Sequence, residues 1–182
     1  MVTGHIETFT ETGIEMKTGE KVEADFIISA TGLTMQRNFP FSTIKVTIDG
    51  EAYKASDHLM YNGIMIGDVP NFAFVMGYTN ASWTLKADIA SLFFAKLLNY
   101  MRDNKVAKVV PKEDPKDPVN HEAFDGGLSS GYFARAKDVL PKQGDRHPWK
   151  GGVNYIVDLI NMSVKSLSKE SLEFTLIDKK KS

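Results

Sequence analysis

The residues whose types and spacing best suggest chemistry lie at the start of a long helical pattern. The segment Gly77-Tyr-Thr-Asn-Ala-Ser-Trp-Thr-Leu85 leads into apolar residues that recur at helical spacing over 81–101. A helix N-terminus presents unpaired N–H groups and a partial positive charge. The amides of Ser82–Thr84 could therefore stabilise negative charge on a ligand. The residue types alone favour a plainer interpretation, in which a polar residue caps the helix and Trp83 lies in the core.

A second candidate site follows an apolar run near the N-terminus. Phe26-Ile-Ile28 leads directly into Ser29-Ala-Thr-Gly32. Small residues at a strand end let a ligand or another backbone come close, and glycine tolerates the unusual angles of such a corner. The continuous apolar run predicts a strand at 25–30 that is buried on both faces, as in a parallel sheet. Thr31 and Gly32 are therefore candidates for ligand contact, with a plain strand-to-loop corner as the alternative.

Several kinds of chemistry have no support in the sequence. No two of the glycines are two residues apart, so no Gly-x-Gly-x-x-Gly can cradle a dinucleotide pyrophosphate. Cysteine is absent, which excludes a thiolate ligand or nucleophile and is compatible with the cytoplasm, where we expect the protein. The four histidines are scattered without metal-ligand spacing, and there is no Gly-x-Ser-x-Gly. We therefore expect no metal site and no catalytic acid or base.

The composition is that of a soluble globular protein. The 182 residues are 42% hydrophobic and 25% charged, with a net charge of -1 that gives no footprint for nucleic acid. No apolar run approaches the roughly 20 residues that a membrane span needs, and the first residues do not resemble a signal peptide.

Patterning along the chain predicts β structure first and a mixture of helix and irregular chain later. An Asp49-Gly50 dipeptide between apolar segments is a strong signal for a tight hairpin. The expected elements are half-buried strands at 4–9 and 13–16, a hairpin at 44–48 and 51–53, short strands in 58–66, a buried strand at 71–76, a largely buried helix at 81–101, an irregular surface connection at 109–125, a helix at 155–164 and a strand at 171–177.

Several blocks, taken together and in order, resemble one known family. The blocks are Ala30-Thr-Gly32, Gly77–Leu85, Ser130-Gly-Tyr132, Leu140-Pro-Lys-Gln-Gly144, Pro148-Trp149, and Tyr155 with Asp158. They are similar to the C-terminal part of class B flavoprotein monooxygenases of the Baeyer–Villiger type. The resemblance extends over nearly the whole chain, and the order of the blocks makes it more specific than any single block.

The resemblance implies a fold class, a domain organisation and cofactors. The fold is expected to be α/β to α+β, as the C-terminal fragment of a flavoprotein with two dinucleotide-binding domains. Residues 1–108 would belong to the NADPH- and FAD-binding domains, and residues 109–182 would form an irregular C-terminal subdomain. The intact enzyme would bind FAD and NADPH, whereas this chain alone would hold neither. The expected flavin neighbours are Thr31, Gly32, Asn80, Ser82 and Trp83.

The resemblance also implies a reaction and a partner. The intact enzyme would insert one oxygen atom of O2 into a ketone, or oxygenate a sulfur or nitrogen atom, as in a thioamide. The chain would need an N-terminal dinucleotide-binding half, and it could form a homo-oligomer. The alternative is a non-catalytic remnant, or an interaction module that complements a flavin-binding half on another chain.

Overall fold

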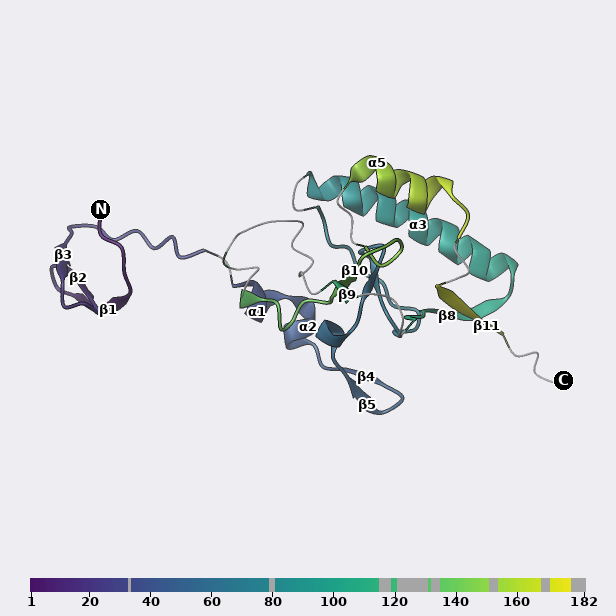
Figure 1. Cartoon of the computed structure of the whole chain (residues 1–182), viewed down its shortest axis with the longest axis horizontal. Helices are drawn as coiled ribbons and strands as arrows, with labels where there is room; N and C mark the ends of the chain where they lie inside the picture. Colours follow the sequence, from purple (N-terminus) through teal and green to yellow (C-terminus); the bar gives the residue numbers. More distant parts are fainter. Residues whose placement is uncertain are drawn as a thin grey trace. The chain divides into compact units, whose positions relative to one another are not determined.

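The computed structural model describes residues 1–32, 34–78, 81–114, 119–120, 131, 135–150, 154–167 and 171–177. These residues fall into two compact units, Met1–Leu33 and Thr34–Ser182. Both are visible in Figure 1, where the first unit is purple and the second runs from blue to yellow.

The first unit is a three-stranded antiparallel sheet in the order β1–β2–β3. Its strands are β1 (Ile6–Thr10), β2 (Gly13–Met16) and β3 (Lys21–Glu23). Gly13 begins β2 so close to β3 that a Cβ atom at this position would overlap the carbonyl of Val22. The strands predicted at 4–9 and 13–16 are present, but only β2 is partly buried, and the expectation of half-burial is wrong for β1, which is exposed along its whole length.

The apolar segment Phe26–Ile28 is not the buried strand that the sequence predicts. It joins no strand among the described residues, and Phe26 and Ile28 are 90% and 89% exposed. A strand of a parallel sheet needs cover on both faces. The described part of the first unit supplies no such cover, so the prediction is wrong for this chain.

The second unit combines short antiparallel strand pairs with one long helix. Its helical elements are α1 (Met35–Asn38), α2 (Pro40–Thr43), the 3-10 turn η1 (Ala55–Asp57), α3 (Trp83–Asp103), α5 (Tyr155–Asp158) and the π-helical turn η2 (Leu159–Val164). Its strands pair as β4 (Val46–Ile48) with β5 (Glu51–Tyr53), β6 (Met60–Tyr61) with β7 (Met65–Ile66), β8 (Val106–Pro111) with β11 (Leu172–Leu176), and β9 (Val119–Asn120) with β10 (Gln143–Gly144). The result is a mixed α/β structure with small sheets.

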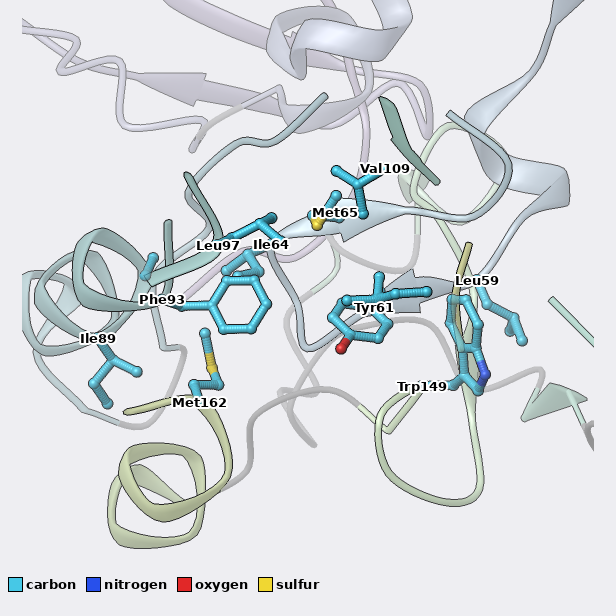
Figure 2. Packing of buried hydrophobic residues seen from close by; sticks show 12 residues of the cluster. Leu59, Tyr61, Ile64, Met65, Ile89, Phe93, Leu97, Val109, Trp149 and Met162 are labelled. Carbon is cyan, nitrogen blue, oxygen red and sulfur yellow. The ribbon is translucent and has the colours of Figure 1, made fainter. Parts of the chain in front are cut away.

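The core of the second unit forms where α3 faces the β6–β7 hairpin. Ile89, Phe93 and Leu97 recur at helical spacing on α3 and point into the same cluster as Tyr61, as Figure 2 shows. The ring of Trp149 meets Tyr61 edge-on, with 5.7 Å between the ring centroids. Trp149 is fully buried and anchors its segment to this core.

Most of the other elements that the sequence predicts in the second unit are present, and three expectations are wrong. The hairpin at 44–53, the short strands in 58–66, the helices beginning near 81 and 155, and the final strand are confirmed. Residues 71–76 form no strand, and Leu92 and Leu98 leave α3 only partly covered, so these two expectations are wrong. Val109–Pro111 is the end of β8 and not an irregular connection.

The resemblance implies a domain boundary between residues 108 and 109, and strand β8 extends across this position. The domain division itself stays a prediction. In the described part of the chain, no helix has the length and apolar character needed to cross a membrane.

Candidate functional site

Helix α3 begins with an exposed first turn that lacks a side-chain cap. Ser82 has the extended backbone conformation of a cap residue (φ -60°, ψ 132°), but its side chain does not bond to the helix backbone. Its Oγ lies instead 2.8 Å from Oγ1 of Thr84. The first turn contains no acidic residue. This helix start therefore keeps the N–H groups and partial positive charge that favour an anionic group.

Trp83, the first residue of α3, does not lie in the core. Its side chain is 56% exposed. The ring covers the backbone just before the helix, since a Cβ atom on Gly77 would overlap it. Gly77 therefore permits the close approach, and Trp83 as a whole stays exposed beside the helix start.

The five predicted flavin neighbours fall in different parts of the structure. Ser82 and Trp83 lie together at the start of α3 in the second unit. Thr31 and Gly32 are exposed and belong to the first unit, and Asn80 lies outside the described residues. Gly32 has φ +82°, with open space where a Cβ atom would stand. Glycine is thus favoured there by the backbone angle and not by crowding.

A buried ion pair fixes the base of this helix start. Lys86 of α3 is 1% exposed, and its Nζ donates hydrogen bonds to Oδ2 of Asp158 at 2.7 Å and to the carbonyl of Asn62 at 2.9 Å. The hydroxyl of Tyr78 donates to the same carboxylate oxygen at 2.7 Å. One carboxylate therefore joins α3, the segment before it and α5, which lies alongside α3 in Figure 1.

The surroundings of this pair indicate a positioning role. Burial lowers the pKa of Lys86, and the charge and hydrogen bond of Asp158 oppose that shift. Burial raises the pKa of Tyr78, and the hydrogen bond to Asp158 raises it further. The ammonium group also lies 3.6 Å from the sulfur of Met162, so its three donors all face protein atoms. Lys86 therefore connects α3 to Asp158 and to the backbone of Asn62, and its ammonium group is buried away from solvent.

Lys86 belongs to none of the motifs described above, and the sequence analysis did not predict it as a site residue. A signal was nevertheless present, since Lys86 precedes Ile89 by three positions and Phe93 by seven, on the buried stripe of α3. A lysine on an apolar stripe requires a buried partner. The partner, Asp158, is 72 residues away, and no local pattern identifies it.

A second group of ionisable side chains shares no residue with the start of α3. Nδ1 of His58 is 3.3 Å from Oε1 of Glu113 and 3.8 Å from Oδ2 of Asp68. Glu113 raises the pKa of His58, while partial burial of the ring opposes the shift. These three side chains could hold a metal ion. Local sequence patterns do not reveal this group, because 10 and 45 positions separate the three residues and this spacing matches no compact ligand motif.

Comparison with known sequences shows which proteins this chain is similar to. Over most of its length the chain is homologous to FAD-binding monooxygenases and corresponds to their C-terminal part. The resemblance seen in the motifs is confirmed at this level. No family model matches the chain, and neither does any solved structure.

Three relatives illustrate the match. The chain is 44% identical over 172 residues to the probable FAD-binding monooxygenase AlmA of an Acinetobacter species, covering 94% of this chain and 34% of the relative. It is 45% identical over 175 residues to the FAD-containing monooxygenase EthA of Mycolicibacterium smegmatis, covering 96% and 35%. For the putative FAD-containing monooxygenase MymA of Mycobacterium tuberculosis the identity is 40% over 158 residues, covering 87% and 31%. The chain thus spans about a third of the length of these relatives.

Proposed function

We propose that this chain is the C-terminal portion of an FAD-dependent, NADPH-consuming monooxygenase and that it completes the flavin site together with an N-terminal dinucleotide-binding part. The reaction would be Baeyer–Villiger oxidation of a ketone or oxygenation of a sulfur or nitrogen atom, as in a thioamide. The observation that carries the proposal is the start of α3, which is exposed and has neither a side-chain cap nor an acidic residue.

The residues of this chain fit one end of FAD. The reduced flavin ring carries negative charge, which the amides at the start of α3 would stabilise. Thr31, Gly32, Asn80, Ser82 and Trp83 are the proposed neighbours of the ring. The pyrophosphate of FAD needs a glycine-rich loop, and the sequence contains none. We therefore propose that the chain alone does not retain FAD.

When bound, the flavin would supply the activation of O2, which protein side chains cannot perform. The contribution of this chain would be binding and orientation. Trp83 offers an aromatic surface beside the helix start, and Lys86 with Asp158 holds that start in a fixed direction. None of these residues is proposed as a catalytic acid or base.

Exposed apolar side chains support the need for an N-terminal part. Phe26 and Ile28 are almost fully exposed in the first unit, and Leu92 and Leu98 are exposed on α3 in the second. Large apolar surface is usually covered in a functional assembly. The part of the relatives that this chain does not match is the proposed cover, either on the same polypeptide or on another.

Reconstitution tests this proposal. The chain is purified without added flavin, and its visible spectrum is expected to lack the flavin bands. It is then mixed with FAD and the N-terminal part of the Acinetobacter relative, and NADPH oxidation is measured with a ketone and with a thioamide. We expect turnover only in the mixture. Stoichiometric flavin or turnover with the chain alone would refute the proposal, and a stable but inactive complex would favour the interaction module.

A substitution at the start of α3 tests the flavin contact in the reconstituted enzyme. Ser82→Pro removes one amide donor, so the flavin reduction potential is expected to fall. Proline is tolerated near helix starts, and circular dichroism with FAD content would establish that the variant folds and binds. Ser82→Ala keeps the amide and is the matched control, with an unchanged potential. An unchanged potential in the folded, FAD-loaded proline variant would disprove the contact.

A further inference from the structure

We propose that His58, Asp68 and Glu113 form a binding site for a first-row divalent metal ion, with Zn²⁺ as the best fit. The three side chains come from separate positions in the second unit. His58 follows the turn η1, Asp68 follows strand β7, and Glu113 lies just beyond strand β8. This site shares no residue with the proposed flavin neighbours, and the proposal does not rest on the function proposed above.

The distances between the ligand atoms match a metal site. Zinc bound at about 2.0–2.1 Å in tetrahedral geometry places neighbouring ligand atoms ~3.3–3.4 Å apart. Nδ1 of His58 is 3.3 Å from Oε1 of Glu113 and 3.8 Å from Oδ2 of Asp68, and one ligand atom from each of the three residues lies within 4.8 Å of the others. The two distances from Nδ1 of His58, 3.3 and 3.8 Å, therefore lie close to the edge of such a tetrahedron, and the carboxylate oxygens lie within 4.8 Å of each other.

The imidazole nitrogen that faces the two carboxylates lacks a hydrogen-bond partner. Nδ1 of His58 is buried, and no hydrogen bond to it is formed within the described part of the chain. The nearest acceptor is Oε1 of Glu113 at 3.3 Å, which already accepts the backbone N–H of Leu59. Buried polar atoms are nearly always satisfied, and an ion is one explanation of an exception. A cation bound there would satisfy the nitrogen and both carboxylates together.

Neighbouring groups already orient the two carboxylates. The backbone N–H of Leu59 donates to Oε1 of Glu113 at 2.6 Å. Lys112 donates to Oδ1 of Asp68 at 3.0 Å, so that the other oxygen, Oδ2, faces His58. Outer contacts of this kind fix ligands in metal sites and raise metal affinity. The lysine neutralises part of the local negative charge, which favours a site of moderate affinity.

The imidazole ring is also held in place. Tyr53 stacks on His58 with 4.4 Å between ring centroids and 23° between the planes. The hydroxyl of Tyr53 donates to the carbonyl of Gly67 at 2.6 Å, which anchors the stack next to Asp68. The ring therefore meets the carboxylates in one defined orientation.

The choice of ion follows from the ligand atoms. One imidazole nitrogen and two carboxylate oxygens suit zinc and its first-row neighbours, whereas magnesium and calcium prefer oxygen alone. All three side chains are partly exposed, so water can supply a fourth ligand. The competing arrangement is a protonated His58 between the two carboxylates, with no metal, and the test below separates the two.

Calorimetry and cobalt spectroscopy test the site in the full chain after dialysis against a chelator. We expect one Zn²⁺ per chain and, with Co²⁺, the visible absorption of a tetrahedral nitrogen and oxygen site. Glu113→Gln keeps an acceptor for Leu59 and should weaken zinc binding at least ~10-fold. Asp68→Asn alters a partly exposed side chain, so folding is not at risk, and should have a similar effect. His58→Gln should abolish the cobalt spectrum.

Two control variants make the test specific. Asp57→Asn removes the carboxylate next to His58 in sequence, and His5→Gln removes an exposed histidine of the first unit, so both should bind zinc normally. Zinc at 100-fold above its Kd should raise Tm by about 5–10 °C in the parent chain. Failure to bind zinc, or equal affinity in the parent and Glu113→Gln chains, would overturn the proposal in favour of the protonated histidine.

Discussion

Replacing Lys86 with methionine tests whether the buried ion pair holds the start of α3. Methionine has a similar length and no charge, so the packing volume is nearly kept. The change leaves the Asp158 carboxylate, whose side chain is 15% exposed, with the Tyr78 hydroxyl as its remaining partner. The expected effect is therefore that of a charge left without its counter-charge in a largely buried position.

The size of the effect follows from this environment. Removing one partner of a buried ion pair costs about 3–5 kcal/mol. Because Asp158 keeps the bond from Tyr78 and limited access to water, we expect the lower end, about 3 kcal/mol, or a fall in Tm of roughly 6–12 °C. Asp158→Asn alone should be similarly destabilising, since it leaves Lys86 unpaired. The double variant removes both charges and should cost only about 1–2 kcal/mol.

Urea unfolding followed by tryptophan fluorescence measures these free energies, because Trp149 is buried in the same unit. Lys108→Met, at an exposed position on β8, is the matched control and should change stability by less than about 0.5 kcal/mol. A loss below about 1 kcal/mol for Lys86→Met would refute the reasoning. So would additive effects of the two single changes, because coupled charges cannot behave independently.

Three further predictions concern packing and the missing cover, and urea unfolding followed by far-UV circular dichroism measures the stabilities because some of the variants lack a tryptophan. Trp149→Ala should cost about 3–5 kcal/mol, whereas Trp83→Ala should cost less than about 1 kcal/mol, because only Trp149 is buried. Joint replacement of Phe26 and Ile28 by serine should leave the stability of the chain within about 0.5 kcal/mol but prevent reconstitution with an N-terminal part, and normal reconstitution would exclude this segment as the contact. Gly77→Ala should destabilise by about 1–3 kcal/mol through overlap with Trp83, and Trp83→Ala should remove that penalty in the double variant.

The elements that sequence patterns predicted well are those that neighbouring residues stabilise. The turn between β4 and β5 is an example, since Asp49 and Gly50 both adopt positive φ (53° and 90°), as an Asp-Gly hairpin turn requires. The long helix was predictable because its apolar residues repeat at helical spacing, and α3 begins within two residues of the expected start.

The two segments predicted as buried strands, at 25–30 and 71–76, show the opposite case. Their apolar runs indicate burial, but burial depends on partners elsewhere in the chain or outside it. In the described chain neither segment joins a strand, and Phe26 and Ile28 face solvent. An apolar run therefore indicates that the segment is to be buried, but it does not identify the residues that bury it.

The sequence by itself determined the hairpins, the long helix, the absence of a dinucleotide-binding loop and the resemblance to flavoprotein monooxygenases. Each depends on residues close together in the chain or on blocks in a fixed order. Only the tertiary structure decided that Lys86 pairs with Asp158, that Trp83 is exposed against Gly77, and that His58, Asp68 and Glu113 meet. The physical reason is that charge pairing and ligand geometry depend on distances in space, and residues far apart in sequence leave no periodic signal of their proximity.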